Sequence, residues 1–207
     1  MVSASEKLPD RLHFIGIGGA GMAPLAAILQ ERGKQLSGSD LIANSLTAKF
    51  ARSGVKIYLG HHTENVPDDT EMIVYSSAVK PDNPEMLKAK ELGIPALRRG
   101  ELLGRLAAEY CRPVAVSGSH GKTTVTAMLV HILRQCQIPC GYMIGGKLSD
   151  NTPSAAAGNN DIFITEVDES DVDIIPRFDI EAEKVTVIEQ RYPRAGRPNA
   201  RVSLYVN

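Results

Sequence analysis

The 207-residue sequence contains no tryptophan, few other aromatic residues (5 % in total) and no long hydrophobic run. So few aromatic side chains leave no evident stacking platform for single-stranded nucleic acid, and a formal net charge of −1 argues against a general polyanion binder. No stretch approaches the roughly 18 apolar residues of a membrane-spanning helix, and residues 1–14 lack the apolar segment of a signal peptide. We therefore expect a cytoplasmic protein with no nucleic-acid and no membrane partner, and its oligomeric state stays open.

Cysteine is also scarce. The three residues, Cys111, Cys136 and Cys140, form an odd set without C-x-x-C spacing, so we expect reduced thiols rather than a disulfide framework or a zinc site. Hydrophobic residues at 43 % and charged residues at 23 % are ordinary values for a globular protein.

Short apolar runs alternate with helical segments from residue 12 to residue 97. The pattern predicts strands at residues 12–17, 34–40, 55–60, 71–78 and 94–97, and helices at residues 22–33, 45–54 and 83–93. A further helix within residues 99–113 must stop before Pro113 and reads as a connector. Repeated β–α units of this length predict a doubly wound parallel sheet, and thus a Rossmann-like α/β domain over residues 1–110.

A second strand–loop–helix unit begins at residue 114. Strands are expected at residues 114–116, 161–167 and 184–189, with a helix that starts near Thr123. The segment of about residues 190–207 has four arginines, no acidic residue and no helical period, and is read as a solvated basic tail. The prediction is an incomplete P-loop-type α/β central domain over residues 111–207.

The first of two glycine-rich loops follows the first predicted strand. Gly16, Gly18 and Gly21 spell G-x-G-x-x-G before a helix, and Asp40 follows 19 positions after the last of them. This fingerprint is typical of dinucleotide sites. Physically it requires only a pyrophosphate-sized anion at a helix N-terminus. NAD, FAD and a UDP-sugar all carry that group, so the loop alone does not choose between them.

The second loop, "SGSHGKTT" at residues 117–124, lies between a strand and a helix, as a P-loop does. Its glycines let successive backbone N–H groups turn toward a phosphate. Lys122 is placed to reach the terminal phosphates, and the Thr123 hydroxyl to ligate Mg²⁺. The sequence has Val116 where the full Walker pattern has its first glycine. The loop predicts binding of a nucleoside triphosphate with magnesium.

Four carboxylates, Glu166, Asp168, Glu169 and Asp171, follow the predicted strand at residues 161–167. Ligands bind at the carboxyl ends of strands in an open α/β sheet. If this strand lies beside the P-loop strand, one of the carboxylates faces the magnesium ion. Strand alternation places Glu166 and Asp168 on one face.

Three segments together, "GIGGAGM", "SGSHGKTT" and "EVDESD", resemble the Mur ligase family in their order and intervals, and "LSGSD", "YSSAVKPDNPE" and "RRGELLGRL" are similar to its N-terminal domain. The likeness covers about residues 11–175, and the family loop also lacks the first Walker glycine. The resemblance implies an ATP-dependent carbon–nitrogen ligase of peptidoglycan synthesis. Its substrates would be UDP-N-acetylmuramate and L-alanine, joined through an acyl phosphate, and its cofactors ATP and Mg²⁺.

The resemblance also implies roles for particular residues. Lys122 and Glu166 would be catalytic, and Thr123 and Glu166 would hold the metal. The ATP-binding residues would be Gly118, Ser119, His120, Gly121, Lys122, Thr123 and Thr124. The UDP-substrate residues would be Gly16, Gly18, Gly19, Ala20, Gly21, Met22, Ser39, Asp40, Ser77 and His62. His61 is a further candidate, whereas His13 and His131 are read as structural.

The sequence departs from the family pattern after the acidic cluster. Val187 stands where the family has an Asn, no Asp-His pair follows, and the third domain is not found. We therefore expect a truncated chain that does not complete the ligation alone, in which residues 1–110 fold well and the remainder is marginal. The alternatives are another Mur-type peptide ligase, an NAD-binding oxidoreductase that uses Asp40 for a ribose hydroxyl, and a non-catalytic UDP-sugar-binding module.

Overall fold

A computed structural model describes residues 7–118, 120–146, 152–166, 174–181 and 184–191, with side-chain burial given up to residue 166. Contacts divide the chain into two units, Met1–Glu166 and Val167–Asn207. No helix of the described residues combines the length and the apolarity needed to cross a membrane.

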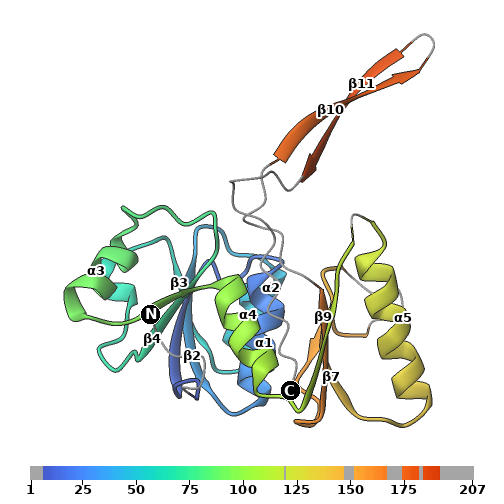
Figure 1. Cartoon of the computed structure of the whole chain (residues 1–207). Coiled ribbons are helices and arrows are strands. Elements are labelled where there is room, and N and C mark those ends of the chain that lie inside the picture. Colours follow the sequence, from blue (N-terminus) through green and yellow to red (C-terminus); the bar gives the residue numbers. More distant parts are fainter. Residues whose placement is uncertain (1–6, 119, 147–151, 167–173, 182–183, 192–207) are drawn as a thin grey trace. The chain divides into compact units, whose positions relative to one another are not determined.

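The first sheet joins five parallel strands in the order β3-β2-β1-β4-β5 (Figure 1). The strands are β1 (Arg11–Ile15), β2 (Gln35–Asp40), β3 (Lys56–Leu59), β4 (Met72–Tyr75) and β5 (Ala96–Arg98). Between and after them come α1 (Met22–Glu31), α2 (Ser45–Arg52), the 3-10 helix η1 (Thr63–Asn65), α3 (Pro84–Leu92) and α4 (Arg99–Ala108). The strand order reverses between β1 and β4, which confirms the predicted doubly wound sheet.

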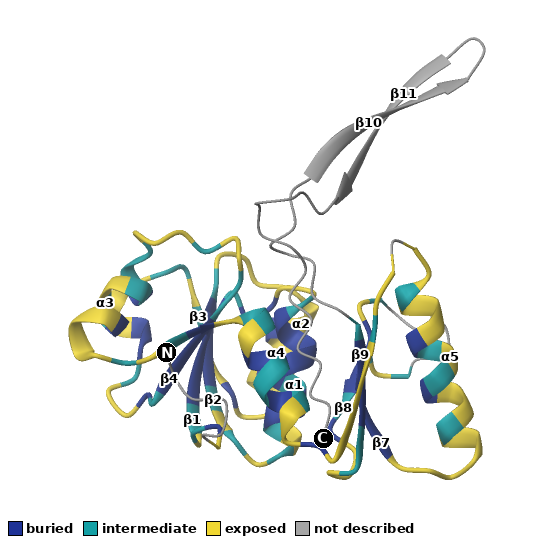
Figure 2. Cartoon of the chain, in the orientation of Figure 1, coloured by how far each residue is buried: buried dark blue, intermediate teal, exposed yellow. Residues whose placement is uncertain are grey.

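The central strand β1 is covered on both faces, so its residues divide between two cores. Leu12 and Phe14 belong to the cluster that includes α1 and α4, whereas Ile15 belongs to the cluster that includes Ala89 of α3 (Figure 2). Because side chains alternate along a strand, His13 shares the face of Ile15. His13 is fully buried, so it needs polar partners on that face.

The second sheet has the order β6-β9-β7-β8. Strands β6 (Arg112–Val116), β9 (Ile162–Glu166) and β7 (Cys140–Met143) are parallel, and the two-residue β8 (Ala155–Ala156) is antiparallel to β7. The helix α5 (Lys122–Gln135) follows β6. This arrangement confirms an α/β fold for the second part of the unit and adds β7 and β8, which were not among the expected strands.

Helix α1 packs against both sheets. Seven of its ten residues are buried, and its core cluster includes Met143, Ala157 and Phe163 from the second sheet and its connections. This double contact explains why the sequence of α1 is apolar on more than one face. Polar contacts join the same parts: the Ala157 N–H donates to Glu31 Oε2 at 2.7 Å, and Arg32 Nη2 donates to Asn160 Oδ1 at 2.8 Å.

The helix ends follow the cap residues in the sequence. The Asn44 side chain accepts from the N–H groups of Leu46 and Thr47 at the start of α2, and Asn83 caps α3 in the same way. Gly93 ends α3 in the left-handed region, at φ +68°, which glycine adopts without steric cost.

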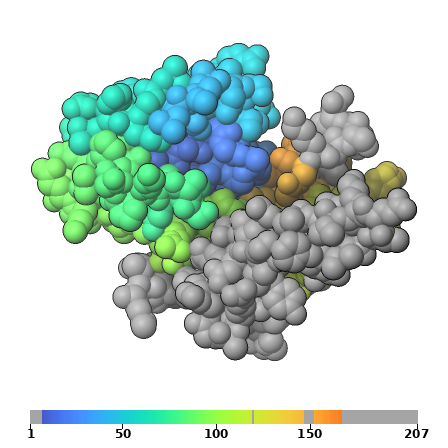
Figure 3. All heavy atoms as spheres, turned by 90° about the horizontal axis from the view of Figure 1, so that it is seen from above, coloured from blue at the N-terminus to red at the C-terminus, as the bar shows by residue number. Residues whose placement is uncertain are grey.

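In the view from above, the segments coloured from light blue to green form one continuous outer surface (Figure 3).

The second unit contains an antiparallel pair, β10 (Ile174–Glu181) and β11 (Lys184–Arg191). Strand β11 includes the strand predicted at residues 184–189. Strand β10 was not predicted, because Pro176 interrupts the run and proline weakens a strand assignment. Most of the expected tail at residues 190–207 lies outside the described residues.

Candidate functional site

The first glycine loop is held by the end of β2. Gly16 has φ +81°, and the carbonyl of Ser39 accepts from the N–H groups of Gly16 and Ile17 at 2.8 and 3.0 Å. The turn then continues with the Gly19 N–H donating to the Gly16 carbonyl at 3.1 Å. The loop ends at Gly21, which is the N-cap of α1. No side chain caps the start of that helix.

Gly18 lies in the most crowded part of this loop. A Cβ atom at Gly18 would come within 2.6 Å of Asn44 Nδ2, 2.7 Å of Thr47 Cγ2 and 2.9 Å of Asp40 Oδ2, so any larger residue would displace these side chains. The Gly18 N–H donates to Asp40 Oδ2 at 2.8 Å, and Asn44 Nδ2 donates to the Gly18 carbonyl at 3.2 Å. In this structure Asp40 thus supports the loop itself.

Arg99, the first residue of α4, lies against the other end of the loop. Its Cδ, Nε and Nη1 atoms would be 3.1–3.2 Å from a Cβ atom at Gly21. A guanidinium beside a helix N-terminus adds positive charge where a phosphate would bind. The motif search did not single out Arg99, because it is distant in sequence and belongs to no glycine pattern.

The other predicted UDP-substrate residues differ in exposure. Gly19, Ala20, Ser77 and His62 are exposed, whereas Ser39 is fully buried. Met22 is 2 % exposed and its side chain belongs to the core, so only its backbone is available at the loop. His62 lies beside Gly60, where a Cβ atom would be 2.9 Å from its Nε2.

The second glycine loop leads into α5. Gly121 is the N-cap of α5 and has φ +78°, a conformation that favours glycine. Lys122 folds back over the loop, with Nζ donating to the Gly118 carbonyl at 2.7 Å. His120, Thr123 and Thr124 are exposed, and Ser119 lies outside the described residues.

Glu166, at the end of β9, lies between the neighbouring strands β6 and β7, close to the second loop. It is paired with Val116 in the β6–β9 ladder, so the carboxylate strand does lie beside the P-loop strand. Its Oε2 accepts from the Thr123 hydroxyl at 3.2 Å, and its Oε1 accepts from the Gly145 N–H at 2.8 Å. The geometry brings Thr123 and Glu166 together, as the metal prediction requires.

Gly145 and Gly146 were not predicted as site residues. A Cβ atom at Gly145 would lie 2.8 Å from Glu166 Oε2, and one at Gly146 would lie 2.9 Å from Thr123 Cγ2. Both glycines therefore allow the β7 end to approach the Thr123–Glu166 pair. The adjacent glycines after a short apolar run were the available signal.

Metal ligation rests on a small donor set. Among the described residues, no three His, Cys, Asp or Glu side chains gather to hold an ion, and Asp168, Glu169 and Asp171 lie outside them. Magnesium bound with a nucleotide typically uses one or two protein oxygens beside phosphates and waters. The Thr123 hydroxyl and the Glu166 carboxylate fit that requirement. The thiols of Cys111, Cys136 and Cys140 are free.

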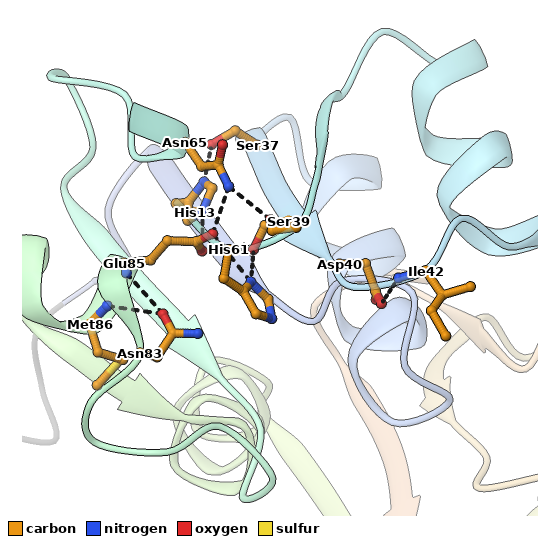
Figure 4. A network of polar contacts seen from close by, with 11 residues as sticks. His13, Ser37, Ser39, Asp40, Ile42, His61, Asn65, Asn83, Glu85 and Met86 are labelled. Atoms are coloured by element: carbon orange, nitrogen blue, oxygen red, sulfur yellow. Dashed lines mark hydrogen bonds and ion pairs between the residues drawn. The ribbon is translucent and has the colours of Figure 1, made fainter. Parts of the chain in front are cut away.

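A buried polar network lies behind the first loop and was missed by the motif search (Figure 4). Its centre is the Glu85 carboxylate, which is fully buried. Burial opposes ionisation of Glu85, but hydrogen bonds from His13, Ser39 and Asn65 outweigh it and lower the pKa of the carboxyl below its usual value of 4.5. No sequence pattern links these positions, which come from four separate elements or loops.

The fold is α/β, with one glycine-rich loop leading into α1 and a second leading into α5, and comparison with known families specifies it further. The model of the Mur ligase family, catalytic domain, matches residues 11–111. A second model, that of the dipeptidyl peptidase IV N-terminal region, matches residues 156–207.

Curated relatives agree with the first match. The chain is 46 % identical over 160 residues to the UDP-N-acetylmuramate–L-alanine ligase of Carboxydothermus hydrogenoformans, covering 77 % of this chain and 34 % of the relative. It is 47 % identical over 161 residues to the enzyme of that name from Aquifex aeolicus, covering 78 % and 35 %. Over these residues the chain belongs to the Mur ligase family. It spans about a third of the length of these relatives.

Solved structures give the same result. A UDP-N-acetylmuramate:L-alanyl-gamma-D-glutamyl-meso-diaminopimelate ligase from Neisseria meningitides has a TM-score of 0.69 at 26 % identity, covering 78 % of this chain and 53 % of that one. The UDP-N-acetylmuramate–alanine ligase of Thermotoga maritima has a TM-score of 0.62 at 26 % identity, covering 75 % and 37 %. The fold is therefore that of the Mur ligases.

Proposed function

We propose that residues 7–166 bind the UDP-sugar and form part of the ATP site of a ligase that joins L-alanine to UDP-N-acetylmuramate. The observation that carries this proposal is the pair of glycine loops on two adjacent sheets, with Thr123 and Glu166 in contact beside the second loop. A dehydrogenase would use only the first loop. The second loop and its carboxylate support a separate nucleotide site.

In this proposal the first loop binds the pyrophosphate of the UDP-sugar. Gly19 and Ala20 present exposed backbone at the N-terminus of α1, and Arg99 lies beside Gly21. Backbone donors, a helix N-terminus and a guanidinium together suit a diphosphate. Asp40 and Ser39 shape the loop from behind, and Ser77 and His62 are exposed candidates for contacts with the rest of the substrate.

The second loop binds ATP. Its residues 118–124 surround the phosphates, Lys122 stabilises the negative charge of the transferred phosphoryl group, and Thr123 and Glu166 hold Mg²⁺. Activation of a carboxylate by phosphoryl transfer depends on positioning and on charge stabilisation. These groups supply both without a nucleophilic side chain.

A second candidate is a murein peptide ligase. Two solved structures with related names, from Neisseria meningitides and Psychrobacter arcticus, superpose with TM-scores of 0.69 and 0.70. The names of the Neisseria meningitides ligase and of the alanine ligases both begin with UDP-N-acetylmuramate. The high sequence identity of the alanine ligases favours the first candidate.

We also propose a division of the chain into residues 1–110 for the UDP-sugar and a central ATP-binding part from residue 111. The C-terminal boundary of that part follows from the division of the chain. Contacts separate the chain at Glu166 and Val167, and the second family model begins at residue 156. The division by contacts favours an end near residue 166 over a central domain that continues to residue 207.

Calorimetry on the purified chain tests the proposal. We expect saturable heat with UDP-N-acetylmuramate and none with NAD. The Gly18→Ala variant should lose this binding, because its methyl group meets Asn44, Thr47 and Asp40. Gly104→Ala is the matched control, since a Cβ atom there has nothing within 4 Å. Heat with NAD but not with UDP-N-acetylmuramate would instead support an oxidoreductase.

The ATP site is tested in a full-length ligase that carries this loop. Lys122→Ala should lower the ligation rate by about 10²- to 10³-fold, as the loss of one preorganised charge-stabilising group does. An unchanged rate would refute the P-loop assignment.

A further inference from the structure

Glu85, in the first turn of α3, is surrounded by hydrogen-bond donors. Its Oε2 accepts from the Ser39 hydroxyl at 2.7 Å and lies 3.1 Å from Nε2 of His13. Its Oε1 accepts from Asn65 Nδ2 at 2.8 Å and lies 3.3 Å from Nδ1 of His61 (Figure 4). Four donors fill the lone pairs of an ionised carboxylate, which has no proton of its own to give.

Counting hydrogens assigns the proton on His61. The Ser39 hydroxyl has one hydrogen, and the carboxylate of Glu85 can only accept, so that hydrogen is donated to Glu85. Ser39 Oγ also lies 3.0 Å from Nδ1 of His61. Since Ser39 has no second hydrogen, Nδ1 of His61 must carry one and share it between Ser39 and Glu85. In the neutral ring, Nε2 is then an acceptor.

His61 connects this network to the first glycine loop. The side chain of His61 is 15 % exposed, whereas those of His13 and Glu85 are fully buried. Its partner Ser39 holds Gly16 and Ile17 through its carbonyl. Among the described residues, nothing bonds to Nε2 of His61. The ring therefore presents an acceptor atom at the carboxyl end of the sheet, where the loop lies.

We propose that Glu85 is a positioning residue of the sugar-nucleotide site, which holds His61 as the Nδ1–H tautomer so that Nε2 accepts a hydrogen bond from the ligand. The group recognised is a donor, namely a hydroxyl or a ring N–H of the nucleotide sugar. It is not a phosphate oxygen, because two acceptors repel. The identity of the ligand rests on the proposed function, whereas the tautomer does not.

The tautomer is tested without ligand by long-range ¹H–¹⁵N NMR of the histidine rings in the full chain, with His61 assigned by its loss in His61→Phe. We expect a protonated Nδ1 and an unprotonated Nε2 at neutral pH. In Glu85→Gln the side-chain amide donates two hydrogens, whereas the carboxylate only accepted them. Nδ1 of His61 should then become an acceptor, so the His61 proton should move to Nε2. An Nε2–H ring in the wild-type chain, or an unchanged ring in Glu85→Gln, would overturn the proposal.

Ser37→Ala is the matched control. The Ser37 hydroxyl lies 2.8 Å from Nδ1 of His13 on the far side of the network and does not touch Glu85 or His61. It should destabilise the fold but leave the His61 tautomer unchanged. The tautomer of the wild-type ring is read without a Glu85 variant, so a Glu85 variant that does not fold leaves that part of the test decisive.

Binding gives a second readout. Titration with UDP-N-acetylmuramate, and with UDP as the shorter probe, should show affinity lowered roughly three- to tenfold in Glu85→Gln and His61→Phe, the effect of one net hydrogen bond. Ser37→Ala should bind like the wild type. If the wild type binds neither probe, the proposed function fails while the tautomer result stands. If all variants bind equally, the positioning role is refuted.

Discussion

Single residues at both loops owe their roles to close approach rather than to their own chemistry. Gly18 leaves room for Asp40 and Asn44, and Gly145 leaves room for Glu166. In each case the glycine N–H donates to the carboxylate that occupies the space, at 2.8 Å. The Asp40 carboxylate thereby fixes the first glycine loop, and the Glu166 carboxylate fixes the segment after β7 beside Thr123, which preorganises these backbone segments for an anion.

Ionisation of Glu85 should make stability depend on pH. Its pKa is lower in the folded chain than its ordinary value of 4.5, so the unfolded chain binds the proton more readily. The stabilisation is therefore complete above about pH 4.5 and is lost as the pH falls toward the lowered pKa. Urea unfolding of the wild type and Glu85→Gln, from about pH 7 to about pH 3, should show their difference in stability shrinking as the pH falls. A constant difference would contradict an ionised Glu85.

The sequence predicted the loop residues but not the residues that support them. Gly16, Gly18, Gly121 and Lys122 belong to local patterns whose physics is contained in a few consecutive positions. Glu85, Asn65 and Arg99 have no such pattern, because their roles arise only when distant segments meet across a parallel sheet. His13 was read as structural, and it is fully buried.

Helices and strands of the first sheet were predicted closely because their ends are marked by strong local signals. Asn44 and Asn83 begin helices and Gly93 ends one. Strands β8 and β10 were missed for different reasons. Strand β8 has only two residues, and β10 contains a proline. Pairing with a neighbour determines such strands, and pairing is not visible in a short stretch of sequence.

Two glycines in or beside helices should respond to alanine in opposite directions. Gly93→Ala forces a side chain into the left-handed region at φ +68° and should lower the free energy of unfolding by about 1 kcal/mol. Gly104 lies inside α4 with open space around it, so Gly104→Ala should raise it by about 0.5–1 kcal/mol. Denaturant unfolding measures both, and a shift of the same sign in both variants would contradict these cap and helix assignments.

The whole first unit depends on contacts between its two sheets. Tyr110 packs on Phe163 with ring centroids 4.7 Å apart, and its hydroxyl bonds to Ala157. The outer helix α5 is less well covered, since Val125, Met128 and Ile132 are about half exposed. Strand β6 is an edge strand and is exposed along most of its length. That residues 1–110 are the more stable part stays a prediction.

Tyr110→Phe tests the contact between the sheets. It removes the bond to the Ala157 carbonyl but keeps the ring, and should lower the free energy of unfolding by about 1 kcal/mol. Tyr75→Phe is the control, because no partner of the Tyr75 hydroxyl is found among the described residues. Thermal unfolding should show a shift only for Tyr110→Phe, about 2–4 °C for a chain of this size. Equal shifts in the two variants would mean that the hydrogen bond between the Tyr110 hydroxyl and the Ala157 carbonyl does not stabilise the fold.

Removal of residues 167–207 tests the division of the chain. Contacts divide the chain between Glu166 and Val167, and a two-stranded hairpin contributes little stability by itself. A chain that ends at Glu166 should therefore melt within about 2 °C of the full chain and bind UDP-N-acetylmuramate with the same affinity. A large loss of both would show that the second unit completes the fold of the first. A lower melting temperature with unchanged affinity would mean that the second unit stabilises the chain but does not contribute to the sugar-nucleotide site.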